Sequence, residues 1–128
     1  YKTSLPTDLV EIAILCVARL WGSEFEWYAH KRIALEKGVN PEIIEAIRNR
    51  QRPDWETDEQ AIIHDFSYAL LSDREVYDEL FERAVDAFGY ETVVDLVGVL
   101  GYYTTIAMTI NVFDVPLPGG VSPELNGS

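Results

Sequence analysis

The sequence predicts an all-α fold, a single-domain bundle of about six helices. Apolar residues recur at helical spacing through most of the chain, and capping residues, glycines and prolines separate the runs. No segment alternates convincingly with the period of two that marks a strand, and no internal repeat or heptad run appears. At 128 residues, 48% of them hydrophobic, the chain can bury one core and is too short for two domains.

The first predicted helix covers residues 9–21. Asp8 and Glu11 have the D-x-x-E spacing of a capping box at its start. Every residue from 12 to 18 is apolar or cysteine, so this helix should be covered on most sides. Gly22 then ends it.

The second predicted helix runs from Ser23 to about Gly38 and has apolar residues at i, i+4 and i+8 along one side. Ser23 and Glu26 repeat the spacing of a capping box. A short third helix is predicted from Asn40 followed by Pro41, an N-cap and first-position pair.

Two further capping pairs predict the fourth and fifth helices. Thr57 with Gln60 precedes one apolar stripe, and Ser72 with Glu75 precedes the next. Gly89 follows the second stripe as a C-terminal cap.

The sixth predicted helix, residues 91–113, is the longest apolar run. It is long enough for a membrane span, but Glu91 and Asp114 flank it in place of Lys or Arg, so we favour a central or interface helix. Prolines and glycines end it, which divides the chain into a helical domain, 1–118, and an extended or disordered tail, 119–128. The small residues that would allow another helix to approach are Gly98, Gly101 and Ala107.

Charge and cysteine content narrow the function. Asp and Glu number 22 against 10 Lys and Arg, a net charge of -12 that disfavours nucleic acid and an anionic membrane as partners. The one cysteine, Cys16, cannot form an internal disulfide and is expected to be buried and inert. The first residues lack the basic and apolar regions of a signal peptide, and we expect a cytoplasmic protein.

Three residues are candidates for proton transfer: Glu11, Glu26 and His30. A carboxylate in the apolar first helix must be paired, hydrogen-bonded or protonated, unless Glu11 is half-exposed in the first turn. Glu26 lies one turn before His30 and could orient its imidazole, although capping explains Glu26 equally well. If the first two helices pack antiparallel about Gly22, Glu11 and His30 are offset by only about one turn. The other histidine, His64, lies between Ile63 and Asp65 on the fourth predicted helix without such support, and we interpret it as structural.

Arginines and aromatic residues are candidates for substrate binding. Arg19 and Arg32 can each bind a carboxylate through two hydrogen bonds, while an ion pair with Glu36 is the structural alternative for Arg32. The aromatic residues that could line a pocket for a flat substrate, or simply belong to the core, are Trp27, Tyr28, Tyr102 and Tyr103. The sequence has no H-x-x-x-H pair, cysteine cluster or glycine-rich phosphate loop, so we expect no metal and no cofactor.

Several segments together carry a family resemblance: the apolar helix with Glu11, then GSEFEWYAHKRIA, NPEIIEAI and LGYYTTIAMTINVF. In this order they resemble the carboxymuconolactone decarboxylase family, which includes the alkylhydroperoxidase D-like proteins. The similarity extends over about residues 5–117. It implies an all-helical domain that assembles into homo-oligomers, often trimers or hexamers.

The resemblance also separates two activities. The peroxidase branch of the family carries Cys-x-x-Cys and a histidine at the positions of Ser23, Glu26 and His30, with a glutamate at the position of Glu11. Without thiols at the first two positions, peroxide reduction is excluded. The decarboxylase branch keeps the histidine without the cysteines, and its members usually have further helical sequence ahead of Glu11, so an oligomer partner could supply a pocket wall. The resemblance therefore implies a cofactor-independent decarboxylase of a small unsaturated carboxylate or lactone; an isomerase or cyclase with the same acid–base pair, or a non-catalytic oligomer, are the alternatives.

Overall fold

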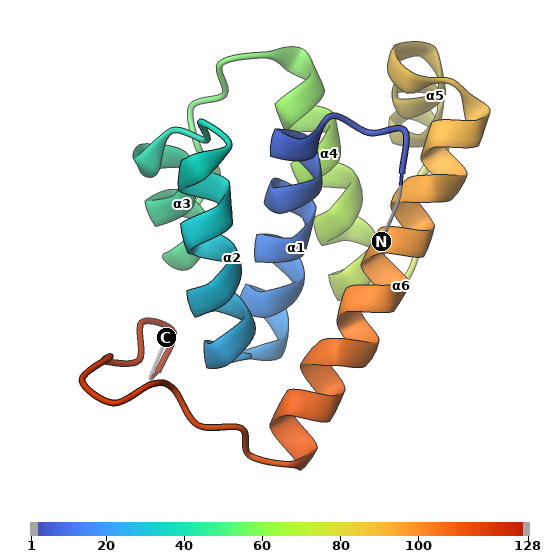
Figure 1. Cartoon of the computed structure of the whole chain (residues 1–128). Helices are drawn as coiled ribbons and strands as arrows, with labels where there is room; N and C mark the ends of the chain where they lie inside the picture. The colour runs from blue at the N-terminus through green and yellow to red at the C-terminus, as the bar shows by residue number, and fades with distance from the viewer. Residues whose placement is uncertain (1–2, 127–128) are drawn as a thin grey trace.

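One helix, α1 (Thr7–Trp21), lies in the middle of the computed structural model, which describes residues 3–126 (Figure 1). The described residues contain five further α-helices and one short π-helix, and no strand. The all-α prediction is therefore confirmed. The other elements are α2 (Glu24–Glu36), α3 (Pro41–Arg48), α4 (Asp58–Tyr68), the π-helix η1 (Ala69–Asp73), α5 (Asp78–Phe88) and α6 (Tyr90–Val112).

Burial of α1 explains why this helix is so apolar. Every residue from Ile12 to Ala18 has no exposed surface, because α2, α3, α4 and α6 all pack against α1. Figure 1 shows α2 and α3 on one side of it and α6 on the other. The prediction that this helix is covered on most sides is confirmed.

Two of the predicted capping boxes are wrong. Pro6 is the N-cap of α1, so Asp8 already lies within the first turn, where Leu9 and Val10 donate to the Pro6 carbonyl instead. Ser23 does occupy the N-cap of α2, but its hydroxyl makes no cap hydrogen bond. The reciprocal bond is missing too, because the carboxylate of Glu26 is buried without a hydrogen-bond partner among the described residues.

The predicted caps of α3 and α4 are confirmed. The side chain of Asn40 accepts from Glu42 N–H at 2.9 Å, and that of Thr57 accepts from Gln60 N–H at 3.2 Å. Gly22 closes α1 in the left-handed conformation, with φ 62°. These local signals fix where the chain turns, because each cap satisfies a backbone group that the helix leaves free.

The predicted start of the fifth helix at Ser72 is wrong. The widened π-turn η1 extends α4 through Asp73, so Ser72 lies inside a helix and not at the head of one. Arg74 ends this turn with φ 64°, and α5 begins only at Asp78.

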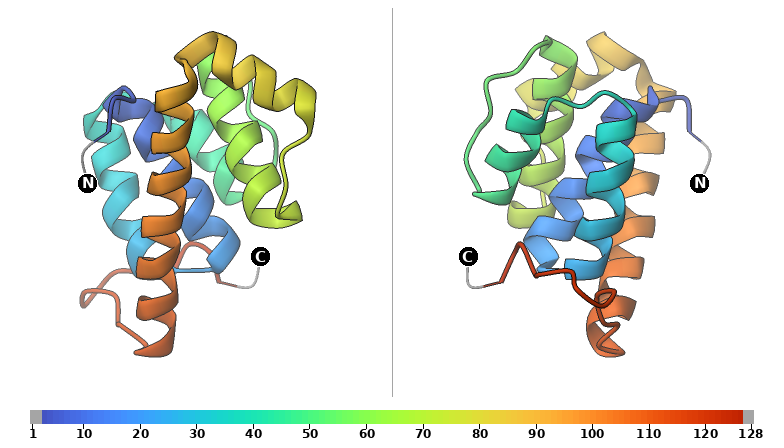
Figure 2. Two further views of the ribbon diagram at one scale, coloured as in Figure 1. Left: turned by 90° about the vertical axis from the view of Figure 1, so that its right-hand side faces the viewer. Right: turned by 60° about the vertical axis from the view of Figure 1, so that its left-hand side comes forward.

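Helix α6 lies along the outside of the bundle and extends past its neighbours, as Figure 2 shows. It packs on α1, α2 and α5, yet only 28% of the most apolar 18-residue stretch of this helix is buried. By length and composition alone this helix could cross a membrane. The central helix is α1. A Cβ at Gly101 would meet open space, so among the described residues Gly101 marks no close helix contact.

After α6 the chain turns back beneath the joined ends of α1 and α2 (Figure 1). This stretch is without helix, and Leu125 is buried in the core at 3% exposure. Residues 1–2 of the predicted domain 1–118 and residues 127–128 of the predicted tail 119–128 lie outside the described part.

Candidate active site

Glu11 and His30 meet across the antiparallel pair of α1 and α2. The distance between Nδ1 of His30 and Oε1 of Glu11 is 2.7 Å, and the two side chains are 17% and 9% exposed. The turn at Gly22 produces this register, since it returns the chain along α1 and leaves the two residues about one helical turn apart. The predicted proximity of the two side chains is confirmed.

Tyr103 completes a group of three. Its ring meets the imidazole of His30 edge-on at a centroid distance of 5.2 Å, and Tyr102 packs on Tyr103 at 5.1 Å. Burial, and next to it the charge of Glu11, raises the pKa of the Tyr103 phenol. The hydroxyl therefore stays protonated and can donate a hydrogen bond near this pair.

A cavity of about 360 Å³ opens on one side of Glu11 and Tyr103. His30 does not line it but contacts both residues, so a molecule in the cavity would meet the carboxylate first. Lys37, at the end of α2, adds a cation to the cavity. The sequence did not indicate this role, because the residues around Lys37 are those of an ordinary solvated lysine. The residues of the lining are Thr3, Leu5, Thr7, Val10, Glu11, Lys37 and Tyr103.

Glu26 lies inside the bundle at 2% exposure. Burial raises the pKa of this carboxyl to about 8, so it is protonated at neutral pH. The charge of Glu26, if it formed, would raise the pKa of Tyr103 further, which places the two groups in one electrostatic neighbourhood. The expected contact from Glu26 to the imidazole of His30 is not formed: Nδ1 of His30 contacts Glu11, and both oxygens of Glu26 lack a hydrogen-bond partner among the described residues.

The remaining predicted site residues lie elsewhere. Arg19 and Trp27 contact the C-terminal tail, through hydrogen bonds to Leu125 and Glu124. Arg32 lies on the exposed side of α2, where its guanidinium stands 5.6 Å from the ring of Tyr28, and no ion pair with Glu36 is formed. Of the six predicted substrate-binding residues, the structure thus brings only Tyr102 and Tyr103 to the Glu11–His30 pair.

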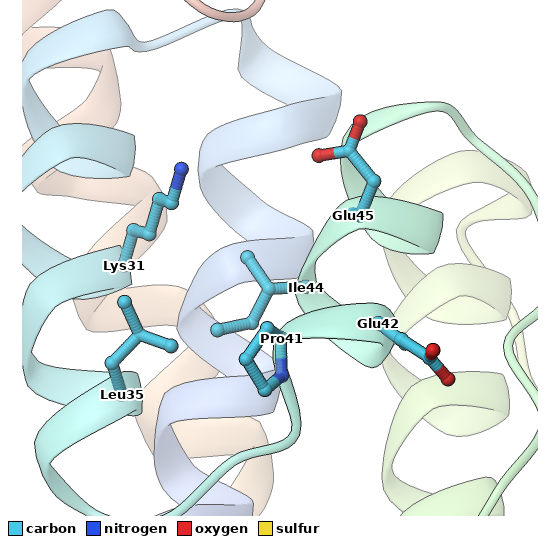
Figure 3. A pocket seen from close by; sticks show the side chains of 6 residues that line it. All are labelled: Lys31, Leu35, Pro41, Glu42, Ile44 and Glu45. Carbon is cyan, nitrogen blue, oxygen red and sulfur yellow. The ribbon is translucent and has the colours of Figure 1, made fainter.

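A second hollow, of about 400 Å³, lies between α2 and α3 (Figure 3). Its floor is apolar, with Leu35, Pro41 and Ile44, and Lys31 and Glu45 stand at one end. It contains neither Glu11 nor His30, so it offers a surface for contacts and no acid–base pair.

His64 is buried on the far side of α1, between two aromatic rings. Its ring lies 4.9 Å from that of Trp55 and 4.7 Å from that of Tyr68, and Nδ1 is 3.1 Å from Asp65. Within residues 3–126, no three His, Cys, Asp or Glu side chains gather as a metal site requires.

Comparisons with family models, with curated proteins and with solved structures found no match to this chain.

Proposed function

We propose that the chain is a cofactor-independent decarboxylase of a small unsaturated carboxylate or lactone, similar in chemistry to the carboxymuconolactone decarboxylases. The observation that carries the proposal is the 2.7 Å contact between His30 and Glu11 beside a cavity of about 360 Å³. A pair of this kind, partly removed from water, can hold a proton and deliver it to a bound molecule.

Binding would begin at Lys37, the cation of the cavity lining, which attracts an anionic substrate. Loss of CO₂ breaks a carbon–carbon bond and leaves its electron pair on the substrate. A conjugated ketone or lactone accepts that pair as an enolate. The Tyr103 hydroxyl, kept protonated by its raised pKa, is the donor that could stabilise the enolate oxygen.

The enolate carbon must then receive a proton. Glu11 faces the cavity and His30 lies behind it, so the pair would pass one proton to the carbon and recover it from water. Glu26, neutral at pH 7, keeps a second negative charge away from this region. In this scheme Glu11 contacts the substrate. His30 orients the Glu11 carboxylate and shares a proton with it.

The test is product analysis with the purified chain and a panel of unsaturated lactones and keto acids. Release of CO₂ that disappears in Glu11→Gln supports the proposal. A product of unchanged mass would instead identify an isomerase or cyclase. Absence of any conversion across the panel would leave the non-catalytic oligomer as the better interpretation.

Thiol peroxidase activity is not part of the proposal. The family positions of the two cysteines hold Ser23 and Glu26, and Cys16 has no exposed surface. Burial also raises the pKa of the Cys16 thiol, so little thiolate forms. Fast labelling of Cys16 in the native protein together with peroxide turnover would contradict this statement.

We also infer a cytoplasmic homo-oligomer, a trimer or hexamer, assembled on α6. This helix exposes Val94, Val97 and Met108, and apolar side chains left exposed together are typical of an interaction surface. Tyr102 lies on the same helix beside Tyr103, so a neighbouring subunit there would supply a wall for the cavity. Sedimentation velocity at micromolar concentration should give a molecular mass of a trimer or hexamer of the 14.5 kDa chain. Val97→Glu should lower that mass. A monomer in both proteins would contradict this inference.

A further inference from the structure

The C-terminal tail is held at its tip. From residue 113 to residue 123 its backbone hydrogen bonds are local, and most side chains there are exposed. Glu124 and Leu125, which we call the tip, then bind at a site formed by α1, α2 and α3. We call this site the tail cradle; its residues are Arg19, Glu24, Trp27, Lys31 and Arg48.

The carboxylate of Glu124 is recognised by two donors. Trp27 donates its indole N–H to Oε1 at 3.2 Å, and Lys31 donates to both oxygens at 2.8 and 3.1 Å. These side chains lie one turn apart on the same face of α2, and an uncharged residue at position 124 would lose the charge-assisted bond to Lys31.

The backbone of the tip is recognised as completely as its side chains. Glu24 Oε1 accepts from the N–H groups of Glu124 and Leu125 at 3.0 and 3.1 Å. Arg48 donates to the Glu124 carbonyl at 3.2 Å, and Arg19 donates to the Leu125 carbonyl at 3.3 Å. Both peptide N–H groups and both carbonyls of the dipeptide are therefore bound, and the Leu125 side chain is buried. The tail cradle thus binds a bent segment in which an acidic residue is followed by an aliphatic one.

The occupant of the tail cradle supplies a hydrogen-bond partner to the buried Arg19. Arg19 is 1% exposed, and its Nε and Nη2 atoms have no hydrogen-bond partner among the described residues. Burying an arginine with few partners is unfavourable, and burial lowers its pKa. Nη1 of Arg19 donates to the Leu125 carbonyl, so the tail supplies a partner for this guanidinium.

The contacts would be the same if the tip came from another molecule. Residues 113–115 still donate to carbonyls of α6, but the backbone hydrogen bond of the described segment 116–123, from Val121 N–H to the Pro118 carbonyl, is internal to the segment. Extended, this segment can span roughly 26 Å at about 3.3 Å per residue. The tail cradle borders the hollow of Figure 3, since Lys31 belongs to both.

We propose that the tail cradle is an interaction site between copies of this chain, which accepts Glu124 and Leu125 of a second copy in place of its own. The required dipeptide is present in this chain's own tail, so a second copy supplies it without any further partner. Exchange of a terminal segment between identical subunits keeps every contact and is a low-cost route to assembly. Within an assembly the neighbour's tip is at an effective concentration comparable with that of the chain's own tip.

The experiment mixes two full-length variants. The first carries Glu124→Ala and Leu125→Ala, which remove the tip from its own cradle. The second keeps the tip but carries Lys31→Glu, which repels the Glu124 carboxylate, and Arg48→Gln, which removes the guanidinium that donates to the Glu124 carbonyl. The matched control is the second variant with its tip also changed by Glu124→Ala and Leu125→Ala. The dissociation constant of the mixed complex is measured by sedimentation with one chain fluorescently labelled, after circular dichroism has verified the helix content.

We expect the intact tip to tighten the mixed complex by about tenfold or more over the control, because charged hydrogen bonds are lost without it. Equal dissociation constants would overturn the proposal. A synthetic peptide of residues 115–126 provides a second measurement on the first variant alone. It should bind saturably, about tenfold more weakly with Gln in place of Glu124. Absence of saturable peptide binding at millimolar concentration would also overturn the proposal.

Discussion

Two histidines of this chain each pair with a carboxylate, yet the two pairs are built differently. His30 reaches Glu11 from another helix at 2.7 Å, whereas His64 contacts its sequence neighbour Asp65 at 3.1 Å. Arg52 also donates to Asp65 at 3.0 Å, while no Lys or Arg of the described chain pairs with Glu11. The Asp65 carboxylate is therefore already engaged by a cation, and that of Glu11 is left for a ligand.

The surroundings of the two pairs also shift the pKa of a nearby carboxyl in opposite directions. Burial alone would raise the pKa of Asp65, but the hydrogen bonds from Arg52 and His64 outweigh it and leave the pKa below its usual range. Near the other pair, Glu26 has no such donor, and its pKa rises to about 8. Both pairs border a hollow at the surface, so access alone does not distinguish them. The difference teaches that a histidine–carboxylate contact suggests chemistry only where no other group neutralises the carboxylate.

The largest expected effect is on turnover, which should depend on the Glu11–His30 pair and not on the Asp65–His64 pair. Glu11→Gln and His30→Ala should each lower turnover by about 100-fold or more, the range of general acid–base catalysis. The double variant should be little worse than either single one, because the two residues act as a unit. CO₂ release under saturating substrate measures this.

The matched control for that comparison is Asp65→Asn, which removes the other carboxylate. It should leave turnover within about threefold of the wild type, since Asp65 faces neither Glu11 nor Tyr103. A loss in Asp65→Asn as large as that in Glu11→Gln would reverse the assignment of the two pairs.

The next effect is on stability, through Glu26. Its folded pKa of about 8 is above the ordinary value of 4.5, so the folded state holds the proton more tightly than the unfolded state. The stabilisation is therefore present below about pH 4.5 and is lost as pH rises through about 8. Across that range the free energy of unfolding should fall by about 3–5 kcal/mol more in the wild type than in Glu26→Gln.

Denaturant unfolding at a series of pH values measures this difference. Glu26→Gln keeps the shape of the neutral acid without the titration, so subtracting its curve removes the contribution of every other group. Parallel curves for the two proteins would mean that Glu26 ionises in the folded state as it does in water.

Much of the fold could be predicted because its signals are local. The caps at Asn40 and Thr57, the stop at Gly22 and the apolar run from 12 to 18 each depend on a few neighbouring residues. The start of α5 was missed for the same reason. Ser72 has the local signature of a cap, but the π-turn η1 carries the helix past it, and no residue pattern in the sequence indicates that turn.

The candidate site could be predicted only in part. Glu11 is visible as a charge in an apolar helix, whereas His30 depends on its place after Glu26 and Trp27 and on the family resemblance, which supports both residues. The contacts of Arg19 and Trp27 with the tail were not visible, since they join residues about 100 positions apart. Lys37 was missed because a cation at the end of a helix looks like any solvated lysine until the cavity beside it is known.

The smallest expected effect concerns the protonation of His64. Burial between Trp55 and Tyr68 lowers its pKa, while its contact with Asp65 raises it and the charge of Arg52 lowers it. The neutral imidazole is favoured in the folded state, so this contribution to stability is present above the ordinary histidine value of about 6.5 and is lost as pH falls. Titration of the ring proton signals by NMR should give a His64 midpoint below that value.

Two variants sharpen this measurement because they should move the midpoint in opposite directions. Asp65→Asn removes the partner that favours imidazolium and should lower the His64 midpoint further, whereas Arg52→Gln removes a repelling charge and should raise it. Arg52→Gln also releases a carboxylate oxygen of Asp65 from its cation, which makes this pair resemble Glu11 and His30 more closely. If both variants shift the midpoint in the same direction, the charges of Arg52 and Asp65 do not control His64, and the contrast between the two pairs rests on burial alone.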